Sequence, residues 1–194
     1  MGYHHGDLRA ALIEASFDSL AECGLQRFSV AAVARRLGVS SAAPYRHFPD
    51  RDHLLSAVSG VAARDLREAI LAAADAAGAD PVDRLAAVAG AYVLYVTRTG
   101  AGFHVIFAAG LSELPDEQRR EHTRALMTTL LDLAVAVEPS SYQEILHLIQ
   151  EIIAVAHGYT MLLTDGFFSL DNGSAGPIAA RAVRAAADLA TARR

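Results

Sequence analysis

Apolar residues recur at the spacing of an α-helix along almost the whole chain. In residues 7–22, for example, Leu8, Leu12 and Leu20 fall near one face, and the charged side chains lie mostly off it. Little of the chain alternates apolar and polar residues as a half-buried strand would. The sequence therefore predicts an all-α fold of about nine helices, at roughly residues 7–22, 29–38, 41–47, 50–76, 81–100, 101–111, 115–137, 139–165 and 177 to nearly the C-terminus.

Pro44 lies inside the third of these segments and disturbs its helical pattern. If Ser40 caps the segment, Pro44 is the fourth helical residue, and its missing N–H leaves the Ser40 carbonyl without its helical donor. The proline ring also crowds that carbonyl, which tightens or distorts the turn. We therefore predict a short helix from Ser41 to His47, which Pro49 ends.

Composition agrees with a soluble helical protein. The chain has 194 residues, of which 53% are hydrophobic and 20% charged. Its single cysteine excludes an internal disulfide and indicates a reducing compartment, and the N-terminus lacks the apolar run of a signal peptide. The charge-free stretch 85–97 is too short to span a membrane. We expect a cytoplasmic protein with no membrane partner.

The net charge of −5 argues against indiscriminate binding of nucleic acid, but one stretch of the chain is basic. Residues 35–51 contain four arginines and one acidic residue, Asp50, so this stretch carries a local net charge of +3. A local basic face is enough for contact with a DNA backbone.

Residues 29–48 have the layout of a helix-turn-helix. A helix of about eight residues ends at Gly38, a turn follows, and a second short helix begins after Ser40. Ala34, four residues before Gly38, is small where two helices would cross closely. In this motif the second helix enters the major groove of DNA. A helical hairpin with a solvated charged face would show the same spacing, so the layout alone leaves both interpretations open.

The side chains of the second helix and its flank suit contact with DNA. Small residues let the helix approach base edges and thymine methyl groups, and polar or cationic ones can bond to bases and phosphates. The small residues are Ser41, Ala42 and Ala43, the hydrogen-bonding ones are Tyr45 and His47, and the phosphate-pairing ones are Arg46 and Arg51.

The stretch SVAAVARRLGVSSAAPYRHFPDRDHLL, residues 29–55, resembles the DNA-binding signature of TetR-family transcriptional regulators. That pattern has a capping Thr or Ser, an apolar-Ala pair, a Gly-Val-Ser turn, Tyr-x-His-Phe, a basic residue and a Leu-Leu pair. Here these are Ser29, Val33-Ala34, Gly38-Val39-Ser40, Tyr45 to Phe48, Arg51 and Leu54-Leu55. With a first helix that also fits, the resemblance covers about residues 3–58.

The resemblance implies a dimeric repressor with a helix-turn-helix domain in residues 1–49 and a ligand-sensing, dimerising domain in residues 50–194, connected by the helix at 50–76. Two positions depart from the family pattern: Pro44 replaces a larger apolar residue, and Arg51 stands where Lys is usual, which changes the hydrogen-bond geometry. Carried over by position, the DNA-binding residues are Ser29, Ala31, Ser41, Ala42, Ala43, Tyr45, Arg46, His47 and Arg51.

The C-terminal part of the chain is expected to hold the effector site. The segment 81–100 is apolar nearly all round and should be central. Aromatic, Met and His side chains there and in neighbouring segments could line a mainly apolar pocket with a few polar groups, although such residues also pack ordinary cores. The predicted lining is Tyr92, Tyr95, Phe103, His104, Phe107, Met127, His157 and Met161.

The last two helical segments are the predicted dimerisation helices. The apolar stripe of segment 139–165 covers about half its circumference, which suits a helix that faces both its own core and a partner. A dimer would place two recognition helices on half-sites about 10 bp apart or a multiple of that. The predicted interface residues are Ile145, Ile149, Ile152, Ala156, Tyr159, Leu163, Ile178, Ala182, Ala185 and Leu189.

These features predict a repressor that binds a palindromic double-stranded DNA operator as a homodimer and is released by a small apolar or amphipathic effector. The alternative is a helical ligand- or partner-binding protein that has lost specific DNA binding. An enzyme is not indicated, because Glu144-x-x-His147 supplies only one half of a di-iron motif. We expect no cofactor, no metal and no catalytic residues.

Overall fold

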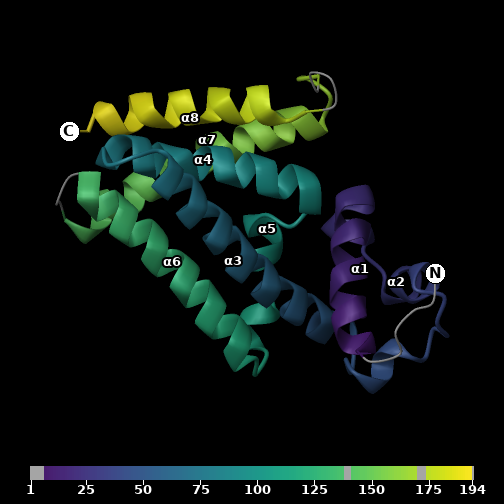
Figure 1. Ribbon diagram of the computed structural model, residues 1–194. Helices are drawn as coiled ribbons and strands as arrows, with labels where there is room; N and C mark the ends of the chain where they lie inside the picture. The colour runs from purple at the N-terminus through teal and green to yellow at the C-terminus, as the bar shows by residue number, and fades with distance from the viewer. Residues whose placement is uncertain (1–6, 138–140, 170–173, 194) are drawn as a thin grey trace. The chain divides into compact units, whose positions relative to one another are not determined.

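The computed structural model describes residues 7–137, 141–169 and 174–193, and its regular elements are helical, which confirms the predicted all-α fold (Figure 1). The predicted helix start at Pro139 lies outside the described residues. The α-helices are α1 (Leu8–Cys23), α2 (Val30–Arg36), α3 (Arg51–Ala76), α4 (Pro81–Thr99), α5 (Phe103–Ile106), α6 (Glu117–Val137), α7 (Tyr142–Thr164) and α8 (Gly176–Thr191), with short 3-10 helices η1 (Leu25–Arg27), η2 (Pro44–Arg46) and η3 (Leu111–Glu113).

Sequence signals set several helix ends. The Asp7 carboxylate accepts a hydrogen bond from the Ala10 N–H at 3.0 Å and so caps α1. Ser141 and Glu144 form a reciprocal capping box at the start of α7, and the hydrogen bonds from Ser141 lower the pKa of the Glu144 carboxyl. Glu144 therefore has a structural role, and the spacing that resembled half a di-iron motif has another explanation.

The prediction for residues 41–47 was wrong in type. The segment forms turns followed by the 3-10 helix η2, and no α-helix. Pro44 has no N–H to give the Ser40 carbonyl, so the Ala43 N–H bonds to it instead at 3.0 Å. The His47 N–H bonds to the Pro44 carbonyl at 2.9 Å, which continues the tighter pattern. The count of α-helices is accordingly eight in the described residues.

The chain packs as two compact units. The first contains the described residues up to 63 together with 99–122, and the second contains residues 64–98 and those described after 122. Helices α3, α4 and α6 each begin in one unit and end in the other. The boundary near residue 49 between the DNA-binding and effector-binding domains remains a prediction, because the two compact units are defined by how residues pack and not by what they bind.

The first unit buries the apolar faces of α1, α2 and α3 together. Leu12, Val33 and Leu54 are fully buried, and Phe48 joins them. Gly100 lies against the end of α1, where a Cβ atom would be 2.5 Å from both the Ala21 nitrogen and the Leu20 carbonyl carbon. Glycine is required there by this close approach and by a φ of +65°.

A polar cluster is buried in the same unit. The Ser59 hydroxyl donates to the Ile106 carbonyl at 2.8 Å, and Arg119 Nε donates to Ser59 Oγ at 3.3 Å. Ser56 donates to the Asp116 carboxylate at 2.8 Å. Burial lowers the pKa of the Arg119 guanidinium, and the Asp116 carboxylate opposes that shift. These bonds connect α3 with α5 and with the start of α6.

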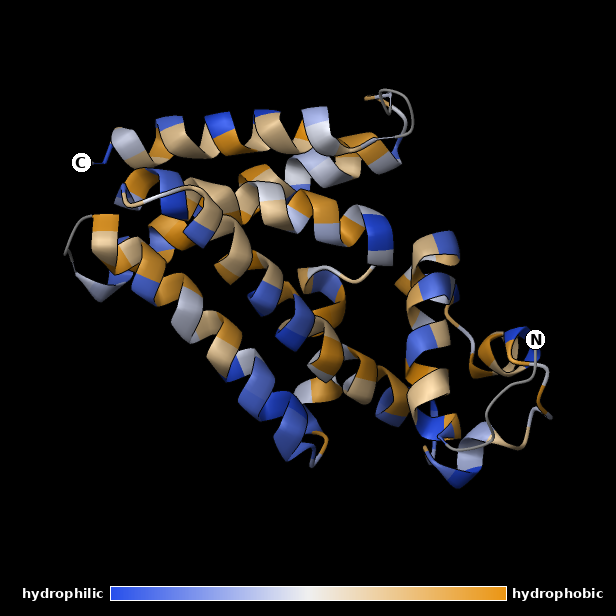
Figure 2. Cartoon of the chain, in the orientation of Figure 1, coloured by the Kyte–Doolittle hydropathy of each residue, from blue (hydrophilic) through white to orange (hydrophobic). Residues whose placement is uncertain are grey.

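In the second unit α4 is the central helix, as the sequence predicts. Twelve of its residues are buried, including Tyr92 and Val93. Figure 2 shows α4 apolar along most of its length, whereas α6 begins hydrophilic and becomes apolar further along. Helices α7 and α8 pack together, and Arg193 near the end of α8 forms an ion pair with Glu151 of α7.

Candidate DNA-binding and effector sites

The turn after α2 holds the recognition segment, which we define as residues 40–48. The Val39 N–H bonds to the Ala34 carbonyl at 3.1 Å, and Gly38 takes a φ of +68°. Ser29 precedes α2 in the extended conformation of a cap, but its side chain makes no capping hydrogen bond. The small Ala34, 1% exposed, permits the close crossing that the sequence predicts.

Pro44 fixes which side chains of the recognition segment face outward. Its ring is buried, and Phe48 after it is also buried, so the residues between them are turned out. Tyr45 is 53% exposed. Of the predicted DNA-binding residues, Ala31, Ser41, Ala42, Tyr45, Arg46, His47 and Arg51 are exposed, and Ser29 and Ala43 are half-buried.

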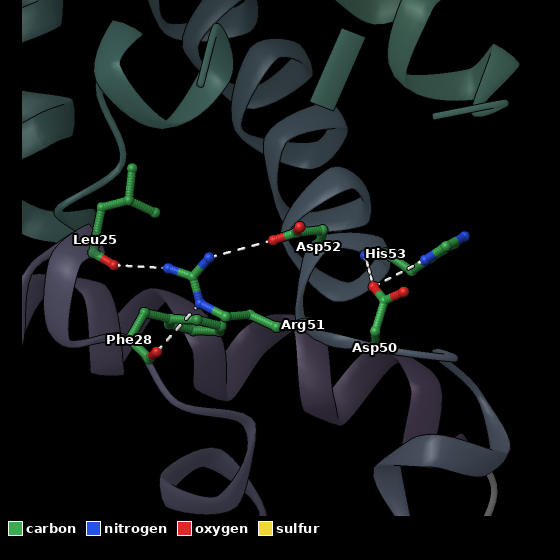
Figure 3. Close-up of polar contacts among 6 residues, drawn as sticks. All are labelled: Leu25, Phe28, Asp50, Arg51, Asp52 and His53. Atoms are coloured by element: carbon green, nitrogen blue, oxygen red, sulfur yellow. Dashed lines mark hydrogen bonds and ion pairs between the residues drawn. The ribbon is translucent and has the colours of Figure 1, made fainter. Parts of the chain in front are cut away.

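Arg46 and Arg51 differ in what they contact. The backbone N–H of Arg46 bonds to the Ala43 carbonyl at 3.2 Å, but its side chain makes no hydrogen bond or ion pair with the described part of the chain. Arg51 donates from Nη2 to the Leu25 carbonyl at 2.9 Å and from Nε to the Phe28 carbonyl at 3.3 Å (Figure 3). It also pairs with Asp52, and its guanidinium lies 5.8 Å from the centre of the Phe28 ring. Arg51 thus fastens the start of α3 to the segment that precedes α2.

We expect Arg51→Ala to lower the stability of the protein, because it removes two bonds to backbone carbonyls. Each is worth about 1 kcal/mol, so the melting temperature should fall by about 4–8 °C. Calorimetry without DNA measures this. Arg46→Ala, the matched control, should leave the melting temperature within a degree or so of the wild type. Equal melting temperatures for the wild type and Arg51→Ala would contradict the structural role.

Asp50 and His53 form a second polar contact beside the recognition segment. The His53 N–H and its ring Nδ1 each lie 2.9 Å from Asp50 Oδ1 (Figure 3). These hydrogen bonds from His53 lower the pKa of the Asp50 carboxyl, which keeps it ionised. Asp50 therefore caps α3, as its position before the helix indicates.

Two further arginines near the recognition segment change the charge pattern. Arg9 of α1 lies over the ring of Phe48 with its Cζ 5.2 Å from the ring centre, and sequence reasoning had not singled it out. The sequence signal for this contact was the position of Arg9 on α1, about one helical turn before the buried Leu12. Arg36, counted in the basic stretch, is instead paired with Glu22 of α1.

The predicted effector-site residues form two groups in different units. In the second unit the Tyr92 hydroxyl lies 2.9 Å from His157 Nδ1, and the two rings meet edge to face. In the first unit Phe103 and Phe107 stack with ring centres 5.5 Å apart, and His104 is exposed. Met127 and Met161 are half-buried.

Of these residues, Tyr95 also lines a groove in the second unit, between α3, α4 and α8. The groove has a volume of about 350 Å³, which is in the range of small-ligand sites. Most of its lining is alanine, and sequence reasoning missed it because alanine carries no chemical signal. The lining residues are Ala69, Ala73, Ala87, Gly90, Ala91, Leu94, Tyr95, Arg98, Ala179, Ala180 and Val183.

Most of the predicted dimer-interface residues are already covered by their own chain. Six of them face the core of the second unit because they form the most apolar side of their helix, and no more than 8% of any is exposed: Ile145, Ile149, Ile152, Ala156, Ile178 and Ala182. Tyr159, Leu163, Ala185 and Leu189 are half-buried. The six buried residues are therefore not available to a partner in this packing.

The helix-turn-helix geometry and the helical second unit define a class of DNA-binding regulator, and comparison with known families agrees. Residues 12–58 match the model of bacterial regulatory proteins of the tetR family, and residues 85–186 match that of the tetracyclin repressor-like C-terminal domain. The second match alone spans more than half of the chain. The chain belongs to the TetR family of transcriptional regulators.

Individual relatives resemble the chain in part or in fold. The HTH-type transcriptional regulator BetI of Stenotrophomonas maltophilia (strain R551-3) is 38% identical over 80 residues, 41% of each chain, so the match covers about two fifths of that relative. A protein of unknown function from Rhodococcus sp. RHA1 has a TM-score of 0.70 and 28% identity over 98% of this chain and 96% of its own. A TetR-like transcriptional regulator from the same organism has a TM-score of 0.64 at 16% identity, covering 97% and 96%.

Proposed function

We propose that the protein is a cytoplasmic, effector-responsive repressor that binds a palindromic operator as a homodimer. The observation that carries the proposal is the recognition segment, in which a buried Pro44 turns Tyr45, Arg46 and His47 outward beside small Ser41 and Ala42. Small side chains admit the segment to the major groove, and the polar ones bind phosphates or base edges. Because Ala42 and Ala43 offer no hydrogen bonds, DNA shape contributes to operator choice.

The surface of α7 supports a dimer. By length and composition this helix would suffice to cross a membrane, with a mean hydropathy of 1.3 in its most apolar window, yet only a third of that window is buried. Leu162 is 40% exposed, and Ala154 is exposed between half-buried Leu146, Ile153 and Met161. An apolar helix face of this kind is stable in water when a second copy covers it. The proposed dimer surface is therefore this outer side of α7, together with the half-buried Ala185 and Leu189 of α8.

A charge in the middle of this surface should separate the dimer. We expect Ala154→Glu to elute as a monomer and to lose at least tenfold in operator affinity, because a buried carboxylate without a partner opposes association. Light scattering coupled to size-exclusion chromatography measures the mass. Ala136→Glu, on an exposed position of α6, is the control and should keep the wild-type mass. A dimeric Ala154→Glu would place the interface elsewhere.

Effector release follows from a difference in affinity between two states. The effector acts only if it binds the DNA-incompetent arrangement more tightly than the competent one. Three helices connect the units covalently: α3 begins in the first unit at Arg51, α4 leaves the second unit near Arg98, and α6 enters the second unit after His122. A shift of any of these helices changes the spacing of the two recognition segments.

Selection from random duplex DNA tests the function directly. We expect enrichment of an inverted repeat whose half-sites lie on one face of the duplex. The alternative function, a ligand-binding protein without specific DNA binding, predicts no enriched motif.

A further inference from the structure

The groove between α3, α4 and α8 is lined mainly by small apolar residues. Its α4 side runs from Ala87 through Ala91 to Arg98, which at 1.5 Å per residue is a length of about 16 Å. Gly90 brings α8 close, since a Cβ at this position would be 2.7 Å from a methyl group of Val183. The side chains of alanine take up little space along α3 and α4, while the contact of Val183 with Gly90 limits the width of the groove on the side of α8, which favours a slender occupant.

One end of the groove carries a cation. The Arg98 guanidinium is exposed, and its Cζ lies 5.8 Å from the centre of the Tyr95 ring. It forms no ion pair with a carboxylate among the described residues, and the lining residues of the groove include no acid. Leu94, 50% exposed, adds an apolar rim one turn earlier on α4. The groove is therefore apolar with positive charge at one end.

We propose that this groove binds a free straight-chain alkyl carboxylate, with the carboxylate on Arg98 and the alkyl chain along the alanines that line the groove. A chain of about ten carbon atoms suits both the length and the volume. The guanidinium matches a carboxylate with two parallel hydrogen bonds, and the chain gains the free energy of burying its methylene groups. This inference deepens the proposed function, since it names the chemical class of the effector.

The position of Arg98 gives the bound carboxylate a route to the DNA-binding helices. Arg98 is two residues before Gly100, whose backbone packs against Leu20 and Ala21 at the end of α1. In this proposal the bound carboxylate lies two residues from the contact of Gly100 with α1, where α4 leaves the second unit. A change in the backbone at this junction is the means by which the carboxylate acts on the first unit.

Calorimetric titration of the purified dimer with decanoate, octanoate and butanoate tests the binding. We expect affinity to rise at least tenfold from octanoate to decanoate, and 1-octanol to bind at least tenfold more weakly than octanoate. Arg98→Gln should weaken decanoate binding by tenfold or more, whereas Arg184→Gln, an exposed arginine of α8 outside the groove, should leave it unchanged. Ala180→Leu should block the groove, and Ala180→Ser should bind decanoate within about twofold of the wild type.

Operator binding of the same variants without any carboxylate separates this inference from the proposed function. Selective DNA binding together with no decanoate binding would overturn the groove proposal and leave the regulator intact. Decanoate binding that depends on Arg98, without DNA binding, would support the groove and overturn the regulator. The proposal would be overturned if Arg98→Gln and Arg184→Gln had equal effects, or if octanol bound as tightly as octanoate. It would also be overturned if decanoate bound only after dilution to the monomer, because a second copy would then occupy the groove in the dimer.

Discussion

Gly100→Ala is expected to destabilise the protein by about 3 kcal/mol or more and to abolish operator binding under conditions where the wild type is folded. Two costs add at this position. The backbone has a φ of +65°, which costs an alanine about 1–2 kcal/mol, and the new methyl group would be 2.5 Å from backbone atoms of Leu20 and Ala21. Backbone atoms cannot swing aside as a side chain can, so α1 itself must move.

Gly110→Ala is the matched control for this prediction. Gly110 has the left-handed backbone, with a φ of +88°, and also belongs to the first unit, but a Cβ there meets nothing within 4 Å. It therefore carries the conformational cost alone. We expect the melting temperature to fall by about 6–12 °C for Gly100→Ala and by a smaller amount, about 2–8 °C, for Gly110→Ala. Similar losses for the two variants would show that the contact with α1 contributes little.

Arg46→Ala is expected to weaken operator binding by about tenfold to a hundredfold at physiological salt, with no change in the melting temperature. The Arg46 side chain is exposed and makes no hydrogen bond or ion pair with another described residue, so its loss leaves the fold intact. A dimer carries two copies, and each phosphate contact contributes about 0.9 to the salt slope. The slope of log affinity against log salt should therefore flatten by about two.

Arg124→Ala provides the control for the Arg46 prediction. Arg124 is an exposed arginine of α6 and lies outside the recognition segment. Its removal changes the net charge by the same amount but should alter the salt slope by less than half a unit. A variant of Arg46 whose slope equals that of the Arg124 variant would remove this arginine from the DNA interface.

The sequence was informative where a residue type has one strong local preference. Glycines and prolines divided the chain into helices whose bounds agree closely with the structure, for example at α3 and α4. The effect of Pro44 on the Ser40 carbonyl was also foreseen. The sequence did not show that a 3-10 helix would form in place of an α-helix. That result depends on the Ala43 N–H bonding to the Ser40 carbonyl, and on the packing of the buried Pro44 ring.

Sites that depend on tertiary packing could not be predicted in the same way. Arg51 matched a phosphate-binding position, yet its bonds to the Leu25 and Phe28 carbonyls join residues more than 20 positions apart. The most apolar side of α7, which includes Ile152, was assigned to a partner, but the chain's own core covers it. Periodicity finds an apolar face and leaves open what covers it. The alanine groove gave no signal until three helices were placed together.

Fluorescence anisotropy tests specific DNA binding by this protein most directly. An operator selected from random duplexes is titrated with the wild-type protein across a salt series and compared with a scrambled duplex. We predict tight binding to the operator, at least a hundredfold weaker binding to the scrambled duplex, and a log affinity that falls linearly with log salt. Weak binding of equal strength to both duplexes would contradict this prediction, and would leave a helical ligand-binding protein whose recognition segment no longer reads DNA.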